Sequence, residues 1–363
     1  MKKIYSLSLL LLGLLVLGSC SDDNDNPYAG GSSITVVKSD LNFDAAASEG
    51  SIVYASAGTV TATVSASWCK AVVDGDSVKV TVTQNNTRNG RAASVTLHQG
   101  TDSLTLAVLQ QGVVINAEKT CVSLDNDEAA SLRYSFVGNI DVSVLSCPDW
   151  ATASIANDSL YVDVTANATG HLRNGYIVYG SGSYTDSIRV FQADFDKDIA
   201  GTYTIYYEKS EDDPTQIAMR NKELTSTSLY VLRTLSLPIT YDSENCALVV
   251  TSGSYLGTNI SSNTTYQVYL AFGLPDGYWT GYYSGQEISA ELTYNDVDGT
   301  CAEFKGSVSD YEFVSLLFRR FTSKNFSEDY DAGTNVYRMI RPVIKRAPVE
   351  AATQTIPAYI ARR

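Results

Sequence analysis

An internal repeat is the feature that most constrains the fold of this chain. Two stretches of the sequence match at a constant offset of 82 residues. The matched pairs are Trp68 and Trp150, Arg91 and Arg173, Gln110 and Gln192, Val80 and Val162, Val82 and Val164, Asn85 and Asn167, and Thr87 and Thr169. Agreement at so many fixed positions is improbable by chance, so the sequence predicts a tandem domain duplication.

Both copies have the hydrophobic pattern of short β-strands. Residues 59–65 alternate threonine with valine and alanine, and residues 78–82 place three valines on one face. The dipeptides Asp74-Gly75 and Asn89-Gly90 are strong turn signals. About seven strands in about 80 residues are typical of an immunoglobulin-like β-sandwich. We therefore predict one sandwich over residues 34–113 and a second, diverged one over residues 114–194.

The first copy resembles the BACON domain, a Bacteroidetes-associated, carbohydrate-binding, often N-terminal family. The resemblance is carried by Trp68-Cys69, by the segment 85–91 and by the closing run Val108-Leu109-Gln110-Gln111-Gly112. In the second copy alanine follows Trp150 and the final glycine is missing. The resemblance implies the sandwich fold and a role in carbohydrate binding.

The repeated tryptophans and arginines have two interpretations. A tryptophan that stacks on a sugar ring would be exposed, whereas one that recurs in both copies is more simply explained as part of the core. We favour the core for Trp68 and Trp150. We expect Arg91 and Arg173 to cover apolar surface or to pair with a carboxylate.

A different composition begins at residue 195, and 16 of the 24 tyrosines lie beyond it. Candidate strands are 201–207, 228–237, 247–251, 265–272, 287–294, 301–306 and 336–343, and residues 313–321 could be a strand or a short helix. Residues 195–346 are therefore predicted to form an antiparallel β-barrel or another sandwich. Gly201-Thr202-Tyr203 resembles the start of lipocalin-type barrels, in which the mouth is the natural pocket. The tail 347–363 has no periodic pattern.

The N-terminus looks like a lipoprotein signal. Lys2 and Lys3 precede an apolar run that ends in Leu17-Gly18-Ser19-Cys20, which resembles a lipobox. Residues 1–19 would then be removed, and Cys20 would carry the lipid. The acidic tether 20–33 contains Ser21-Asp22-Asp23-Asn24-Asp25-Asn26, which resembles the signal that sends Bacteroidetes lipoproteins to the outer face of the outer membrane. The alternatives are ordinary cleavage and a tether with no address.

Charge and cysteine content limit the partners. A formal net charge of −14 repels phosphates, so nucleic acid is not expected as a partner. Apart from Cys20, five cysteines remain, and an odd number cannot close fully into disulfides. We therefore favour buried thiols that act as small apolar side chains.

One aromatic segment is the best binding candidate. Tyr278, Trp279, Tyr282 and Tyr283 follow a Pro275-Asp276-Gly277 turn, so they are predicted to lie on a loop. Exposed aromatic rings on loops offer flat faces to sugar C–H groups. We expect Trp279 and Tyr282 to be the stacking platform; the alternative is that these rings pack as core.

Four Asp-Ser-aliphatic triplets resemble the O-glycosylation acceptor of Bacteroidetes. Their serines are Ser77, Ser103, Ser159 and Ser187. Plain turn chemistry is the alternative, because aspartate and serine both favour turns.

No motif for catalysis, metal binding or a cofactor stands out. The chain has two histidines, His98 and His171, without a nucleophile motif or a metal-binding spacing of cysteine and histidine. The sequence thus favours a non-catalytic, lipid-anchored surface protein of the outer membrane that binds a dietary or mucin-type glycan. The alternatives are a structural or adhesive surface protein with the sandwiches as spacers, which could contact other surface proteins, and a hydrolase with an unrecognised C-terminal domain.

Overall fold

The computed structural model describes residues 33–201, 203–212, 217–221, 224–225, 228–232, 235–346 and 361–362. The predicted signal sequence, Cys20 and nearly all of the tether lie outside the described residues, as do residues 347–360 of the tail. The described chain is almost entirely β and divides into two compact units. The first holds residues up to Asn85 and Gly90–Gln111, and the second holds Asn86–Asn89 and all residues from Gly112 on.

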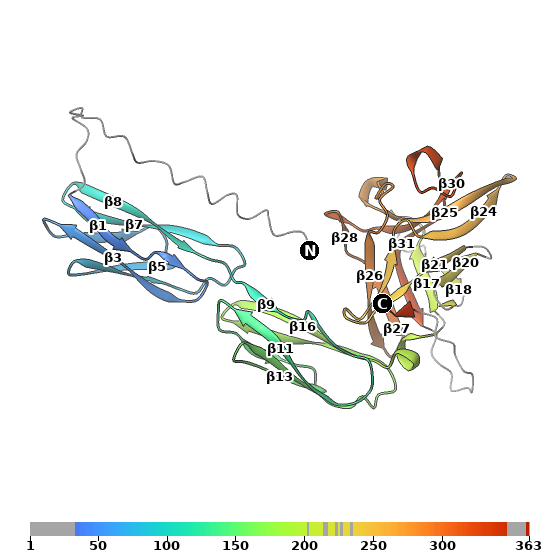
Figure 1. Cartoon of the computed structure of the whole chain (residues 1–363), viewed down its shortest axis with the longest axis horizontal. Coiled ribbons are helices and arrows are strands. Elements are labelled where there is room, and N and C mark those ends of the chain that lie inside the picture. The colour runs from blue at the N-terminus through green and yellow to red at the C-terminus, as the bar shows by residue number, and fades with distance from the viewer. Residues whose placement is uncertain are drawn as a thin grey trace. The chain divides into compact units, whose positions relative to one another are not determined.

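The first unit is a sandwich of two four-stranded sheets, drawn in blue to cyan in Figure 1. One sheet has the order β1-β3-β6-β5 and the other has the order β2-β8-β7-β4, in which β2 and β8 are parallel. The strands are β1 (Ile34–Ser39), β2 (Asn42–Phe43), β3 (Ser48–Ser56), β4 (Thr61–Val64), β5 (Cys69–Asp74), β6 (Ser77–Val82), β7 (Arg91–Gln99) and β8 (Asp102–Gln110). Val78, Val80 and Val82 are all buried, as their alternation predicts for one face of a strand.

A second sandwich opens the second unit and repeats the first. Its sheets are β10-β16-β15-β12 and β13-β14-β11-β9, with β10 and β16 parallel. The strands are β9 (Ile115–Ala117), β10 (Cys121–Leu124), β11 (Ala130–Gly138), β12 (Ser143–Ser146), β13 (Ala151–Ala156), β14 (Ser159–Val164), β15 (Arg173–Ser181) and β16 (Tyr184–Gln192). From β11 to β16, both ends of each strand lie 82 residues after those of β3 to β8. The sequence repeat is thus a repeat of strands.

One 14-stranded sheet makes up the C-terminal part, and its strands are antiparallel except for the pair β22 and β32. The strands are β17 (Tyr203–Glu208), β18 (Ile217–Asn221), β19 (Leu224–Thr225), β20 (Ser228–Leu232), β21 (Leu235–Pro238), β22 (Thr240–Asp242), β23 (Ala247–Thr251), β24 (Tyr255–Ser261), β25 (Thr264–Gly273), β26 (Glu287–Asn295), β27 (Gly299–Phe304), β30 (Ser315–Phe321), β31 (Asp331–Arg346) and β32 (Ala361–Arg362). A separate small hairpin joins β28 (Ser307–Val308) to β29 (Tyr311–Glu312).

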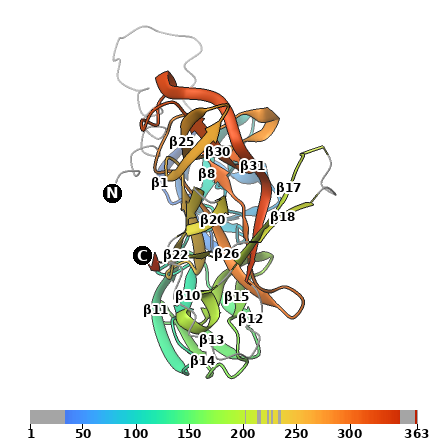
Figure 2. The ribbon, with the colours of Figure 1, turned by 90° about the vertical axis from the view of Figure 1, so that its right-hand side faces the viewer.

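The large sheet curls back on itself through residues 235–242. The start of this segment, β21, pairs with β24, and its end, β22, pairs with β23. The remaining strands connect β24 to β23 in the order β24-β25-β30-β31-β27-β26-β23, so the path closes as a barrel. Figure 2 shows β31 as a long curved strand beside β30. Apolar side chains such as Phe272, Phe304 and Phe318 are buried, as expected for a barrel whose interior is packed.

The structure resolves one open question about the predicted C-terminal strands and corrects one of them. Residues 315–321, left open between strand and helix, form β30. The predicted strand 228–237 is instead two strands that pair with each other, with Ser228 opposite Pro238. The apolar pattern continues across this reversal, so periodicity alone gives no sign of it.

The hydrophobic cluster of the barrel includes a few residues of the second sandwich. Leu172 and Phe191 of the sandwich belong to it together with Tyr203 and Tyr241 of the barrel. A short helical turn, η1 (Phe195–Ile199), joins the two parts. The hydroxyl of Tyr203 donates to the carbonyl of Ile199 at 2.6 Å, which ties the first barrel strand to this turn. A search of the described residues finds no helix with the length and apolar character needed to cross a membrane.

Candidate functional site

The residues that define the repeat contact one another in the folded first sandwich. The guanidinium carbon of Arg91 lies 4.3 Å from the ring centre of Trp68. Its Nε donates to Oε1 of Gln110 at 2.8 Å. The amide nitrogen of Gln110 donates in turn to the carbonyls of Ala45 and Ala46, both at 3.2 Å. Gln110 thereby ties the arginine to the backbone of a segment distant in sequence.

The second sandwich repeats this cluster. Arg173 lies 4.4 Å from the ring centre of Trp150, and its Nε donates to Gln192 at 3.0 Å. Both tryptophans are half-buried, and Trp68 packs against the core of its sandwich. A stacked arginine covers one face of each ring, so these tryptophans and arginines support the fold.

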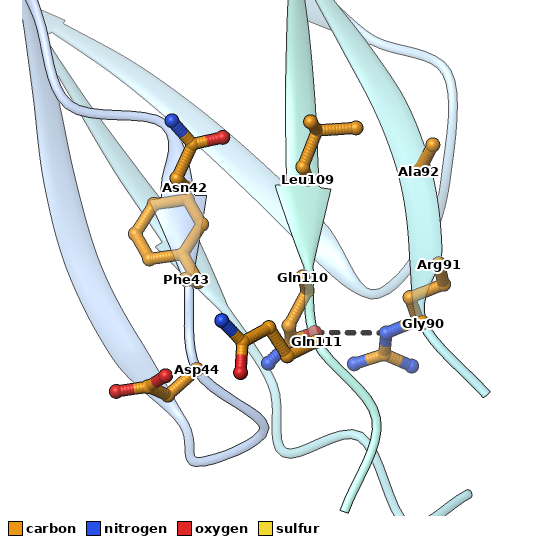
Figure 3. Close-up of a pocket in the computed structure, with 9 residues that line it drawn as sticks. All are labelled: Asn42, Phe43, Asp44, Gly90, Arg91, Ala92, Leu109, Gln110 and Gln111. Carbon is orange, nitrogen blue, oxygen red and sulfur yellow. Dashed lines mark hydrogen bonds between the residues drawn. The ribbon is translucent and has the colours of Figure 1, made fainter. Parts of the chain in front are cut away.

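A groove of about 640 Å³ lies beside this cluster in the first sandwich (Figure 3). Its lining residues are Asn42, Phe43, Asp44, Gly90, Arg91, Ala92, Leu109, Gln110 and Gln111. Leu109, 47% exposed, gives the groove an apolar wall. The dashed line in Figure 3 is the bond between Arg91 and Gln110, so this arginine is already engaged.

The predicted aromatic segment lies on the loop between β25 and β26, and hydrogen bonds hold it in place. The loop begins with a tight turn, η2 (Pro275–Gly277), in which Asp276 has a φ of 57°. The backbone amide of Leu274 donates to the backbone carbonyl of Tyr278 at 2.8 Å. The hydroxyl of Ser252 donates to the backbone carbonyl of Tyr283 at 2.9 Å. The loop is therefore fixed to the barrel at both ends of the aromatic run.

Two of the four predicted residues support this loop. The guanidinium carbon of Arg319 lies 4.1 Å from the ring centre of Trp279, and the Tyr282 ring meets Trp279 edge-on at 5.0 Å. The Tyr282 hydroxyl donates to Asp331 at 2.9 Å, and Nε of Arg319 donates to the same oxygen at 2.9 Å. Burial, and then the bond to Asp331, raises the pKa of Tyr282 above its usual value. Trp279 and Tyr282 are accordingly half-buried.

The other two residues project into solvent. Tyr278 and Tyr283 are each 72% exposed. A run of aromatic residues does not reveal which rings pack and which stay free, because that depends on residues distant in sequence. Arg319 and Asp331, which hold Trp279 and Tyr282, lie on β30 and β31, and no local signal in the sequence marked them.

Further aromatic rings of the barrel continue from this loop. Tyr282 lies 6.2 Å from Phe326, Phe326 lies 5.5 Å from Tyr269, and Tyr269 lies 5.3 Å from Tyr255, all between ring centres. Tyr255 is 43% exposed. Tyr269 is only 8% exposed, so this row of rings is partly buried.

The four Asp-Ser-aliphatic serines differ in environment. Ser103 and Ser187 are exposed. Ser77 is half-buried and donates to the carbonyl of Asp74 at 2.9 Å, in the turn before β6. Ser159 is only 4% exposed, and its hydroxyl accepts from Nε of Arg133 at 3.1 Å.

Across the described ranges, no three histidine, cysteine, aspartate or glutamate side chains are grouped so that they could hold a metal ion. His98 lies 3.1 Å from the hydroxyl of Thr63, and His171 stacks on Tyr294 at 3.5 Å. A cleft of about 420 Å³ in the barrel has Glu303, Glu312 and Lys305 among its lining residues.

Comparison with known proteins identifies one domain. The BACON family model, described as "Putative binding domain, N-terminal", matches residues 58–111. The search of curated proteins found no match.

Solved structures give partial likenesses. The Bacteroides ovatus GH5 xyloglucanase in complex with a XXXG heptasaccharide is 29% identical over 26% of this chain and 22% of its own, with a TM-score of 0.22. This chain thus spans about a fifth of the length of that enzyme. A titin Ig tandem is 8% identical over 45% of this chain and 97% of its own, with a TM-score of 0.22. An endo-fucoidan hydrolase from glycoside hydrolase family 107 is 10% identical over 45% of this chain and 29% of its own, with a TM-score of 0.23.

Proposed function

We propose that this chain is a non-catalytic, lipid-anchored protein of the outer membrane surface that binds glycans through its C-terminal barrel. In this proposal Tyr278 and Tyr283 present the ring faces that contact sugar. Trp279 and Tyr282 hold those rings in position. The BACON match supports a binding role in general, and the aromatic loop supports a role for the barrel in particular.

The observation that carries the proposal is a pair of exposed rings on a loop that is already ordered. Large aromatic side chains are normally at least half covered by protein, so rings that are 72% exposed are unusual. The hydrogen bonds of Tyr282 and Arg319 to Asp331 tie the loop to β30 and β31. A preordered loop loses little conformational entropy when it binds a ligand, and this improves affinity.

Charge favours neutral glycans over polyanions. The chain has a formal net charge of −14, and this field repels sulfated or uronic polysaccharides at low ionic strength. Sugar C–H groups and hydroxyls match the apolar face and phenol hydroxyl of a tyrosine. We therefore expect neutral plant or mucin-type oligosaccharides to be preferred.

The test is a glycan array probed with the full chain carrying Cys20→Ala, followed by calorimetry on each hit. Tyr278→Ala and Tyr283→Ala should each weaken binding about tenfold, the scale of losing one aromatic contact. Tyr176→Ala is the matched control, because Tyr176 is 48% exposed but lies on the second sandwich. Absence of binding across a broad panel would favour the structural or adhesive alternative.

The anchor is tested separately. Cys20→Ala should abolish partitioning into detergent and association with membranes, because the lipid is attached to that sulfur. Ser21→Ala, its neighbour, should partition like the wild type. Unchanged partitioning of the Cys20→Ala protein would refute the lipid anchor while leaving glycan binding open.

A further inference from the structure

Two cysteines meet where the second sandwich joins the barrel. Cys121 lies on β10, and Cys246 immediately precedes β23. Their sulfur atoms are 3.5 Å apart, although 125 residues separate them in sequence. Cys121 is 6% exposed and Cys246 is fully buried. Both belong to the cluster shared by the sandwich and the barrel.

The backbone at Cys246 gives a second reason to single out this pair. Cys246 has a φ of 52°, in the left-handed region that favours glycine and asparagine. A residue with a Cβ in this conformation is strained. Cysteine is therefore less favourable than glycine or asparagine for the backbone of this turn. Its contact with Cys121 offers a reason for a cysteine at this position.

A buried arginine holds the two cysteines together. Cys121 lies opposite Arg189 in the pairing of β10 with β16. Nη1 of Arg189 donates to the carbonyls of Asn245 and Cys246, both at 3.1 Å, and Nη2 donates to the carbonyl of Leu292. The guanidinium therefore fastens the turn that carries Cys246 to the strand beside Cys121.

We propose that Cys121 and Cys246 form a disulfide that locks the second sandwich to the barrel when the chain folds in an oxidising compartment. The sulfur atoms lie 3.5 Å apart and would lie about 2.05 Å apart in the disulfide. Among the five cysteines in the described residues, Cys121 and Cys246 lie in sulfur–sulfur contact.

The oxidant is a disulfide, carried by a small molecule or by a thiol oxidoreductase. The Cys121 thiolate attacks one sulfur of that disulfide, whose S–S bond breaks and releases one thiol. The Cys246 thiolate then attacks the Cys121 sulfur and releases the second thiol. Two electrons and two protons thus pass from the cysteines to the oxidant. The same balance holds if Cys246 reacts first and Cys121 second.

Burial restricts when this exchange can occur. A large oxidant cannot reach sulfur atoms that are 6% and 0% exposed, so the bond should form before the junction packs. The test is therefore refolding. The full chain with Cys20→Ser is unfolded in reductant, refolded with oxidised and reduced glutathione, alkylated and digested without reduction.

Mass spectrometry of the peptides should identify a cross-link between Cys121 and Cys246, with Cys69, Cys147 and Cys301 alkylated. The intact protein should be lighter than the reduced form by two hydrogen atoms. Recovery of both Cys121 and Cys246 in alkylated form, or of cross-links spread among all five cysteines, would overturn the proposal.

Thermal unfolding supplies a second readout. Closing so long a loop should raise the melting temperature of the oxidised protein above that of the reduced protein by on the order of 10 °C. Cys121→Ser is the matched control and should melt at the same temperature with and without reductant. If that variant does not fold, the comparison of oxidised and reduced wild type still decides, because equal melting temperatures contradict a locking disulfide.

Discussion

At the scale of single residues, a neutral side chain organises each sandwich. Gln110 is 3% exposed and bonds both to the arginine that covers Trp68 and to backbone carbonyls of another segment. An amide can do both, because it has an acceptor and two donor hydrogens. A carboxylate would accept from the arginine but could not donate to the carbonyls.

Gln110→Ala should therefore destabilise the first sandwich by about 2–4 kcal/mol, because it removes the buried amide and its hydrogen bonds to Arg91 and to three backbone carbonyls. Hydrogen exchange of β6 and β8 in the full chain would measure the loss. Gln111→Ala is the matched control; Gln111 is the exposed neighbour, and its truncation should cost less than about 0.5 kcal/mol. Equal effects of the two variants would argue against this role for Gln110.

The predicted glycosylation sites separate on the same scale. An acceptor hydroxyl must reach an enzyme, so we expect sugar on Ser103 and Ser187 and none on Ser159, whose hydroxyl is buried against Arg133. Glycopeptide mapping of the native protein checks this. Unmodified Ser103 and Ser187, with an intact mass equal to polypeptide plus lipid, would leave the turn interpretation of these triplets.

At the scale of elements, one carboxylate couples the aromatic loop to two strands. Asp331 begins β31 and accepts from both Tyr282 of the loop and Arg319 of β30. Its side chain is 8% exposed and that of Arg319 is 13% exposed. In a charge pair this buried, each charge offsets the cost of burying the other. Removing one partner therefore leaves a buried charge without its counterion.

Asp331→Asn should weaken glycan binding several-fold by loosening the loop, and should cost about 1–3 kcal/mol of stability. It should also lower the pKa of Tyr282 toward its usual value, because the hydrogen bond and negative charge of Asp331 raise that pKa. NMR titration of the tyrosine rings would detect this shift. Asp329→Asn, at an exposed position, is the control and should leave both quantities unchanged.

Some strands around this loop could be predicted from the sequence and others could not. Alternation and turn dipeptides predicted β23, β25 and β26 almost to the residue, because each depends on its own side chains. The sequence did not predict β22 and β24, which depend on pairing with other segments. The division of the aromatic run into supporting and exposed rings likewise depends on contacts with residues distant in sequence. Those pairings leave no period in the local sequence.

At the scale of the whole molecule, the cores do not follow the repeat. The repeat predicts two equivalent sandwiches, and the strands recur at the expected offset. Their cores nevertheless differ, because Leu172 and Phe191 of the second sandwich belong to the cluster of the barrel, whereas other buried residues of that sandwich, such as Leu160 and Ile177, do not. The hydrophobic core at this junction is formed by residues far apart in sequence. The 82-residue repeat, which identifies the two sandwiches, therefore does not predict it.

Regions that share a core tend to lose protection from hydrogen exchange together. We therefore expect the second sandwich and the barrel to open as one unit. Leu172→Ala removes a fully buried side chain from the shared cluster and should cost about 2–5 kcal/mol. Exchange should then accelerate both in β14 of the sandwich and in β26 of the barrel. Ile52→Ala is the matched control, because Ile52 is fully buried in the core of the first sandwich and its truncation should accelerate exchange only within that sandwich. Faster exchange in β14 with unchanged β26 would mean that the sandwich and the barrel open separately despite their shared cluster.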